Sequence, residues 1–329
     1  MLLPLLFALL TPAHADDGKK DKDQDARPAV EMSGKLFAHY KYDLSEGADG
    51  YNEFGLDRAY LRADGTITDR LSTRVTLDAN RISDPAVDTR YRVFIKHAYL
   101  EWKTGMKGVK GQAGVIETPF GPMLDDFWGH RYIEDNFPAV AIKLATADAG
   151  IGATGKHMDG MVNWGAVLVN GEGYSKIEVD SGKQAQVKVT VDPMAGNKEL
   201  SLPITGFVAY AFNPNDASQL IASGVIGFDQ KFFTGSVQAL FNQQYDINGF
   251  GYSVIALPRV PKVATLVFRM DHYDPNTEVD DDANTKLIVG ASHNFHKKVA
   301  VAGTFQQTSY EATPDLPSQG VFLNMLAGF

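Results

Sequence analysis

The segment Q-G-V-F-L-N-M-L-A-G-F, from Gln319 to Phe329, alternates apolar residues with small or polar ones. The apolar register contains Val321, Leu323, Met325, Ala327 and Phe329. Phe322 and Leu326 interrupt the other register, which otherwise holds glycine and asparagine. This two-residue period predicts a β-strand with one apolar face. A last strand that ends on an aromatic residue is typical of membrane barrels, in which the ring lies at the lipid–water boundary.

The same pattern recurs from Glu31 onward, in segments of about ten residues, the length of a tilted membrane-spanning strand. We therefore expect an all-β fold, a transmembrane antiparallel β-barrel of about sixteen strands. The expected strands are residues 31–43, 54–66, 70–81, 92–103, 108–118, 142–154, 160–170, 182–191, 201–212, 218–229, 231–244, 250–257, 263–273, 286–295, 299–309 and 319–329. A soluble sandwich would alternate in the same way, but so many strands without a long helix favour the barrel.

The links between these strands are alternately short and long along most of the chain. The long links are residues 44–53, 82–91, 119–141, 171–181, 274–285 and 310–318. Short periplasmic turns opposite longer extracellular loops would produce this alternation, and an even number of strands would place both termini on the periplasmic side.

Residues 1–15 are predicted to be a signal peptide, because the apolar run Leu2 to Leu10 precedes the small-x-small sequence Ala13-His14-Ala15. A buried N-terminal helix is the alternative. Residues 16–30 carry mixed charges and predict a disordered lead-in. The barrel would then occupy residues 31–329, and the protein would be exported to the outer membrane of a Gram-negative cell.

The composition excludes several functions. The formal net charge of −9 argues against a nucleic-acid partner, and the absence of cysteine excludes disulfides and thiolate metal sites. The acidic run from Asp280 to Asp282 could hold Ca²⁺, but it lacks the spacing of an EF-hand loop and fits a solvated loop better. No catalytic motif such as G-x-S-x-G occurs, so we expect no enzymatic activity, no metal and no cofactor.

Four motifs resemble the phosphate-selective porin O and P family. The segment F-G-L-D-R-A-Y-L-R-A-D-G-T-I-T-D-R-L, Phe54 to Leu71, resembles the family's Arg-rich strand that runs into G-T-L-x-D. H-A-Y-L-E-W, His97 to Trp102, resembles its D-A-Y-L-E-W/Y strand. G-Q-A-G-V-I-E-T-P-F-G, Gly111 to Gly121, resembles its G-Q-F-K-T-P-F-G. M-D-H-Y-D-P-N-T, Met270 to Thr277, is similar to its Y-D-P-N/D loop entry.

The resemblance implies an outer-membrane diffusion pore of about sixteen strands, usually a homotrimer, with a constriction loop after the fifth strand. It is strongest over residues 54–121 and weaker over 263–329. In the family, the terminal strand pattern resembles the signal read by the outer-membrane assembly machinery, which implies that role for Phe329. This sequence has Glu117 where the family often has a lysine before T-P-F-G.

The longest link, Pro119 to Ala141, combines aromatic and charged residues. Long links with several aromatic residues are usually packed, so we expect this one to fold into the lumen and narrow it. An extracellular lid, or a brace against a neighbouring subunit, is the alternative. The candidate constriction residues are Asp125, Asp126, Trp128, Arg131, Glu134 and Asp135.

Basic side chains fall on the inward register of the second to fifth strands. The candidate pore-lining residues are Arg58, Arg62, Arg74, Arg92 and Lys110. Such a row facing an acidic loop would order polar solutes and favour anions, although each residue taken singly also fits a solvated structural charge. We expect passive diffusion of small hydrophilic solutes through a barrel surrounded by outer-membrane lipid. The alternative is a barrel with a blocked lumen that serves as a structural or surface-interaction protein.

Overall fold

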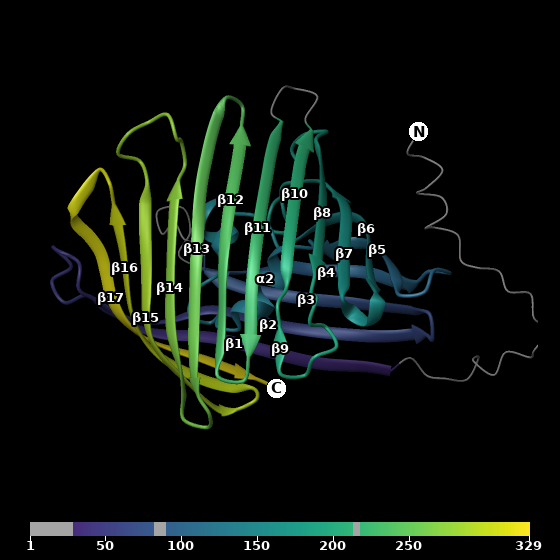
Figure 1. Cartoon of the computed structure of the whole chain (residues 1–329), viewed down its shortest axis with the longest axis horizontal. Helices are drawn as coiled ribbons and strands as arrows, with labels where there is room; N and C mark the ends of the chain where they lie inside the picture. Colours follow the sequence, from purple (N-terminus) through teal and green to yellow (C-terminus); the bar gives the residue numbers. More distant parts are fainter. Residues whose placement is uncertain (1–28, 82–89, 213–217) are drawn as a thin grey trace, which may run out of the picture.

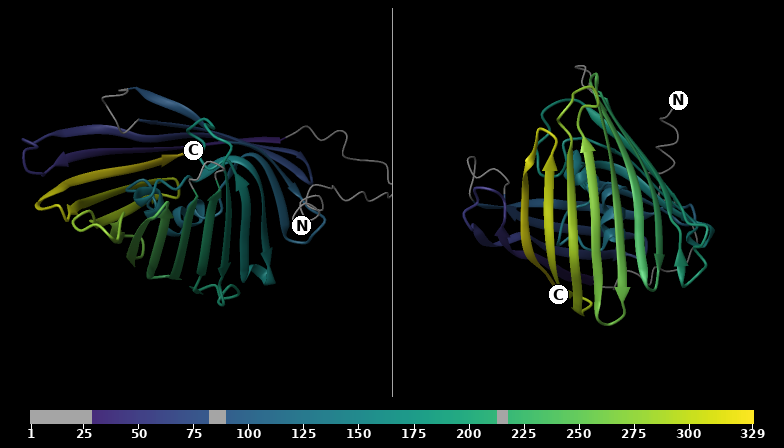
Figure 2. Two further views of the ribbon diagram at one scale, coloured as in Figure 1. Left: turned by 90° about the horizontal axis from the view of Figure 1, so that it is seen from above. Right: turned by 60° about the vertical axis from the view of Figure 1, so that its left-hand side comes forward.

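The structure is a computed structural model that describes residues 29–81, 90–212 and 218–329. In these residues the chain forms one antiparallel sheet, which closes on itself because β17 (Thr313–Gly328) pairs with both β16 (Val299–Tyr310) and β1 (Ala29–Asp43) (Figures 1 and 2). The predicted signal peptide lies outside the described residues, as do residues 16–28 of the predicted lead-in. Residues 29 and 30, predicted to belong to the lead-in, are instead the first residues of β1.

Each strand of the barrel lies beside its neighbours in sequence. The remaining strands are β2 (Asn52–Thr68), β3 (Leu71–Arg81), β4 (Tyr91–Lys103), β5 (Val109–Glu117), β6 (Ala147–His157), β7 (Val162–Val169), β8 (Lys183–Val191), β9 (Leu200–Ser201), β10 (Ile204–Phe212), β11 (Gln219–Gln230), β12 (Phe233–Gln244), β13 (Ile247–Val260), β14 (Ala264–Asp274) and β15 (Asn284–His296). The two-residue strand β9 pairs with β11, and the other sixteen close the barrel. This confirms the predicted antiparallel barrel.

Helices in the described residues are few and short. They are α2 (Gly121–Trp128), α3 (Phe137–Ala141) and the 3-10 turn η2 (Met158–Gly160). No helix in the described part of the chain is long and apolar enough to cross a membrane.

In the wall of the barrel, apolar side chains are exposed and polar side chains are buried, which is the reverse of a sheet in a soluble protein. In β8, Val187 and Val189 are 49% and 41% exposed, whereas Gln186 is only 2% exposed. Val75 and Leu77 of β3 are likewise on the exposed face, with the buried Thr76 between them. An apolar outer face with polar side chains inside is the arrangement of a barrel whose outer wall contacts hydrocarbon.

The closing strand has the predicted register. Leu36 is opposite Ala327, and Asp43 is opposite Gly320. Leu323 is 53% exposed on the outer face, whereas its neighbour Asn324 is 2% exposed on the inner face. The predicted apolar face of the last strand therefore points outward, and the strand pairs with the first to close the barrel.

The two apolar interruptions of this strand lie on the inner face. Leu326 packs beside a buried cluster that includes Trp128, and the Phe322 ring lies 6.0 Å from Lys41 Nζ. The Phe329 ring lies over Gly34, where an added Cβ would be 2.3 Å from a ring carbon. A larger residue at position 34 would therefore displace the terminal ring.

Two predicted boundaries differ most from the structure. The strand expected at 142–154 begins only at Ala147, because the N–H groups of Ile142 and Leu144 donate back to the Pro138 carbonyl of helix α3 and Lys143 has a positive φ of 56°. The loop expected at 310–318 is a tight hairpin, and β17 already begins at Thr313. Its two prolines, Pro314 and Pro317, fall in the register irregularity between the pairs Tyr310–Thr313 and Thr308–Ser318, and bulges of this kind tolerate proline.

Candidate functional site

The connection between β5 and β6, residues 118–146, lies inside the ring of strands (Figure 2). Glu117 pairs with Ala147, so the chain leaves the wall and returns to it at the same point. Phe120, Trp128 and Phe137 are 0%, 1% and 3% exposed. These aromatic side chains are buried because they pack against inward-facing residues of distant strands. We refer to residues 118–146 as the inner segment.

One apolar cluster joins the inner segment to the wall at β10–β12 and β14. The rings of Phe120 and Phe207 are stacked, with centroids 4.3 Å apart and an interplanar angle of 5°. The buried members of this cluster are Phe120, Leu124, Phe137, Leu144, Phe207, Ala209, Ile221, Val225, Leu240 and Tyr273. Aromatic pairs of this kind stabilise by about 0.5–1.5 kcal/mol beyond the area they bury.

A buried arginine holds the inner segment to β14. Arg269 is 1% exposed, and its guanidinium carbon lies 5.1 Å from the centre of the Trp128 ring. It donates through Nη1 to the carbonyl of Asp135 at 2.7 Å, and through Nε and Nη2 to the Asp271 carboxylate. The Arg269 guanidinium thus donates hydrogen bonds both to a carboxylate of the wall and to a backbone carbonyl of the inner segment.

Two side chains of β15 add further attachments. Lys286 forms an ion pair with Glu134. The His130 imidazole is 2.9 Å from the Ser292 hydroxyl through Nε2, and its Nδ1 donates to the Trp128 carbonyl at 2.9 Å. The inner segment is therefore anchored at several points on this wall.

Replacing Arg269 with Met is expected to destabilise the protein by about 3–5 kcal/mol, because it leaves the buried Asp271 charge without its partner. Urea unfolding of the folded barrel measures this loss. The matched control is Arg259→Met, which removes a partly exposed pair with Asp229 and should cost about 1 kcal/mol or less. Equal losses in the two variants would contradict the anchoring role of Arg269.

The opposite wall, formed by β1–β4, carries paired cations. Arg58 donates to the Tyr60 hydroxyl at 2.9 Å and lies 3.8 Å from both Asp78 and Asp135. Arg131 of the inner segment lies 3.1 Å from Asp125 and 3.0 Å from Asp135. Asp135 thus bridges an arginine of the wall and an arginine of the segment.

A β-bulge in β4 turns two consecutive side chains inward. Thr76 is opposite His97, but Leu77 is opposite Ile95, so Lys96 is the extra residue. Lys96 and His97 are 5% and 7% exposed. Neither residue was among the predicted site residues, and regular alternation would have turned only one of the two inward.

The bulge places an unpaired cation beside unsatisfied polar groups. Lys96 Nζ lies 5.0 and 5.6 Å from the centres of the Tyr60 and Tyr174 rings. Within the described residues, Lys96 forms no ion pair. Its one hydrogen bond, at 3.4 Å, is donated to the Tyr60 hydroxyl. The Thr76 hydroxyl and both His97 ring nitrogens are buried without a hydrogen-bond partner. Buried polar atoms without partners are costly, so this site favours water or a polar solute.

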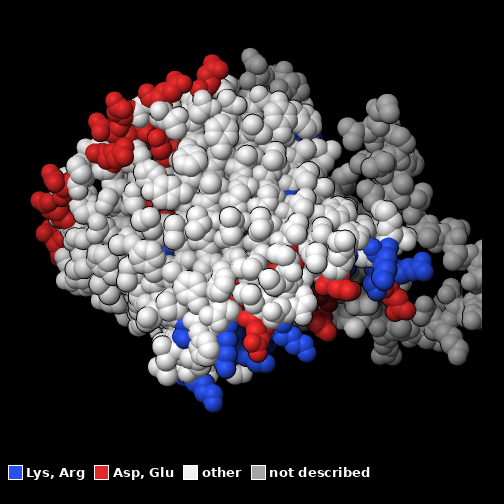
Figure 3. All heavy atoms as spheres, viewed as in Figure 1, with Lys and Arg blue, Asp and Glu red and all other residues white. Residues whose placement is uncertain are grey.

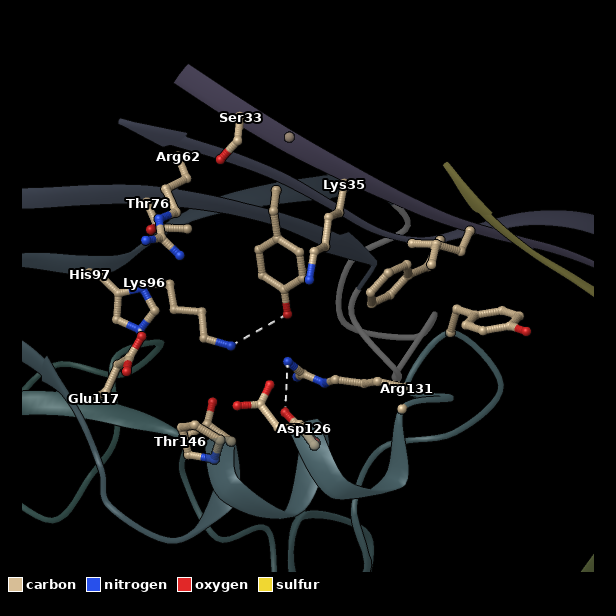
Figure 4. Close-up of a pocket in the computed structure, with 18 residues that line it drawn as sticks. Ser33, Lys35, Arg62, Thr76, Lys96, His97, Glu117, Asp126, Arg131 and Thr146 are labelled. Carbon is tan, nitrogen blue, oxygen red and sulfur yellow. Dashed lines mark hydrogen bonds and ion pairs between the residues drawn. The ribbon is translucent and has the colours of Figure 1, made fainter. Parts of the chain in front are cut away.

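Two cavities follow the inner face of this wall. The first, of about 360 Å³, lies between the wall and the inner segment (Figure 4). Its charged lining residues are Lys35, Arg62, Lys96, Glu117, Asp125, Asp126 and Arg131. The second, of about 740 Å³, has the charged lining residues Arg74, Glu101, Lys103, Lys107, Lys110, Glu117 and Lys156. Glu117 lines both, and we call the two cavities together the basic lane.

The predicted basic residues are distributed unequally over this wall. Arg62 lines the first cavity, and Arg74 and Lys110 line the second. Arg74 is held by Asp64 at 2.8 Å and Glu117 at 2.7 Å, and Lys110 by Glu101 at 2.7 Å. Arg58 is part of the paired cluster and lines neither cavity, and Arg92 lies near the exposed start of β4.

The predicted constriction residues separate into two groups. Asp125, Asp126 and Arg131 line the first cavity, and Figure 4 labels Asp126 and Arg131 there. Trp128 and Glu134 instead contact the wall at β14 and β15, through Arg269 and Lys286. No group of three or more His, Asp or Glu side chains suited to a metal ion occurs in the part of the chain that the structure describes.

No protein-family model matches the chain, and no curated protein matches its sequence. Solved structures do match. An anion-selective porin from Comamonas acidovorans has a TM-score of 0.64 at 14% identity, over 92% of this chain and 100% of that one. The trimer form of the Vibrio cholerae outer membrane protein OmpT has a TM-score of 0.61 at 13% identity, over 92% and 100%. OprB from Pseudomonas putida has a TM-score of 0.68 at 8% identity, over 91% and 94%.

These likenesses show that the chain has the fold of outer-membrane porin barrels. At such low identity they establish the fold alone. The resemblance to the phosphate-selective O and P family stays a prediction.

Proposed function

We propose that the protein is a Gram-negative outer-membrane porin for passive diffusion of small hydrophilic solutes, with a preference for anions. The observation that carries this proposal is the basic lane, because its two cavities share Glu117 and lie along one wall of a porin-type barrel. Nine of its charged lining residues are basic and four are acidic. Basic side chains along a narrow path raise the local concentration of anions without any bond-making step.

In this proposal the inner segment is the constriction. It fills the lumen on the side of β10–β15 through its apolar contacts, and it leaves the basic lane on the side of β1–β7. The first cavity has room for roughly twelve water molecules at about 30 Å³ each, so solutes must be small. Lys96, His97 and Thr76 would replace part of the hydration shell of a passing anion.

We further propose export through the predicted signal peptide, insertion through the assembly machinery that reads Phe329, and a homotrimer. The trimer is supported by the trimeric form of the structurally similar Vibrio protein. The apolar outer face of the wall supports the membrane location.

Single-channel recording in planar bilayers tests the function. Steady current steps on the order of a nanosiemens are expected for an open pore of this class, with a reversal potential in a KCl gradient that has the sign of chloride selectivity. Cation selectivity would refute the anion preference. Phosphate added to the chloride bath would reduce the current if the resemblance to the phosphate-selective family extends to its solute.

A second candidate function is a structural or surface-interaction barrel with a blocked lumen. The observation that favours it is the extent of the inner segment's contacts, which reach β2, β10, β14 and β15. Absence of current from a correctly folded protein would support this candidate and exclude the pore.

A further inference from the structure

Three neighbouring turns at one rim of the barrel carry exposed lysines. Lys231 lies between β11 and β12, Lys262 between β13 and β14, and Lys297 and Lys298 between β15 and β16. These turns are adjacent because the strands are consecutive in the sheet. We call the four lysines the lysine rim. Within the described residues, no ion pair joins any of them to a carboxylate, so their charges are available to an external anion.

Exposed apolar side chains accompany the lysine rim. Phe232, Val263 and Phe295 are 52%, 61% and 68% exposed. Lys231 Nζ lies 5.2 Å from the centre of the Phe232 ring. An ammonium group beside an outward-facing aromatic or aliphatic side chain is suited to the boundary between phosphate headgroups and acyl chains.

The opposite rim of the same face has the opposite charge. Asp246, Asp280, Asp281 and Glu311 are exposed in its turns. Figure 3 shows acidic residues alone along the upper left edge, basic residues together with some acidic ones at the lower edge, and a largely uncharged surface between them. The turns at the two rims of this face therefore differ in charge.

We propose that the lysine rim binds the phosphate groups of anionic phospholipids in the leaflet that surrounds it. This inference rests on the proposed membrane location. The ammonium groups would contact lipid phosphates, and Phe232, Val263 and Phe295 would contact the first methylenes of the acyl chains. Juxtamembrane lysines attract anionic lipid surfaces in this way. The acidic rim repels the same lipids, so the two leaflets would be recognised differently.

Native mass spectrometry of the full chain in detergent, titrated with phosphatidylglycerol or phosphatidylcholine, tests this proposal. The folded protein should retain phosphatidylglycerol at least tenfold more strongly than phosphatidylcholine. The variant Lys231→Gln/Lys262→Gln/Lys297→Gln/Lys298→Gln should lose that preference. Inorganic phosphate at the same concentration should not displace the lipid, because it lacks the acyl chains that the apolar side chains contact.

The matched control changes the net charge by the same amount at the acidic rim. It is Gln244→Glu/Thr277→Glu/Thr313→Glu/Ser318→Glu, at four exposed positions, and it should retain phosphatidylglycerol. Equal losses in both variants, no lipid preference in the parent protein, or displacement by free phosphate would each overturn the proposal. If the quadruple lysine variant does not fold, Lys297→Gln/Lys298→Gln should still lose part of the preference, and an unchanged preference would overturn the proposal.

Failure of this proposal and failure of the pore can be distinguished. The lysine variant should conduct like the parent protein in bilayers. A silent barrel that still prefers phosphatidylglycerol would refute the pore and leave the lysine rim in place.

Discussion

Replacing residues 119–145 with the two-residue turn Asn-Gly is expected to raise single-channel conductance severalfold. The barrel should still close, because Thr118 N–H donates to the Thr146 carbonyl at 3.1 Å and Glu117 pairs with Ala147. These ends are already opposite each other, and Asn-Gly is a favoured turn between antiparallel strands. The shortened chain would lose the proposed constriction and keep the wall.

The same variant should be less stable than the parent protein. It exposes Phe207, Leu240 and Ile288 to lumen water, since their packing partners lie in the inner segment. Each large apolar side chain contributes about 1.5–3 kcal/mol when buried. The strand ladder and the apolar outer face are untouched, so a lower melting temperature is expected, without loss of the folded barrel in detergent.

The matched control shortens the connection between β14 and β15, residues 275–283, in the same way. Tyr273 is opposite Asn284 at the base of that connection, and none of residues 275–283 lines the basic lane. Its conductance should equal that of the parent protein. Unchanged conductance in the 119–145 variant would contradict the constriction, whereas current only in that variant would identify a blocked lumen.

Most of the wall can be predicted from the sequence, because its outer face imposes one simple pattern. Val187, Val189 and Val191 alternate with polar residues since one register must match hydrocarbon. Boundaries near irregular backbone are less predictable. The apolar residues from Phe137 to Ala141 fit a strand or a helix, and a local cap from Asn136 decides for the helix.

The candidate site could be predicted only in part. Alternation correctly places Arg62 and Arg74 on the inner face. In β4, alternation gives two conflicting results. If the apolar Ile95 faces outward, the next residue, Lys96, faces inward; if the apolar Ala98 faces outward, the residue before it, His97, faces inward. That conflict is the sequence signal of the bulge.

The contacts between the inner segment and strands β10–β15 could not be predicted, because no local sequence pattern indicates them. Phe207 and Arg269 are distant from the segment in sequence, and only barrel closure brings them to it. Their partners could not be chosen from the sequence, because every inward position of β10–β15 was an equal candidate.

The variant Lys35→Gln/Lys96→Gln is expected to lower the anion-to-cation permeability ratio severalfold. Both lysines line the first cavity, and neither forms an ion pair with a carboxylate in the described part of the chain. Their removal therefore lowers the positive potential of the basic lane without leaving a buried carboxylate unpaired. Arg58 is a poorer target, because its loss would leave Asp78, which is 0% exposed, without its cation.

Reversal potentials in a KCl gradient measure the ratio, and Lys188→Gln, which removes one inner-face charge, is the control, compared per charge removed. Lys188 lies on β8 opposite the buried Phe207, and thus on the inner face of the barrel, but it lines neither cavity of the basic lane. If anions pass through the basic lane along β1–β7, the control should keep the parent selectivity. Salt screens the charge of Lys188, which lies outside the basic lane. An equal shift in both variants would mean that ions are not confined to the basic lane and that the inner segment leaves a second path beside β8. A shift in the double variant alone, with unchanged conductance in the control, would assign the selectivity to the bulge and its cavity.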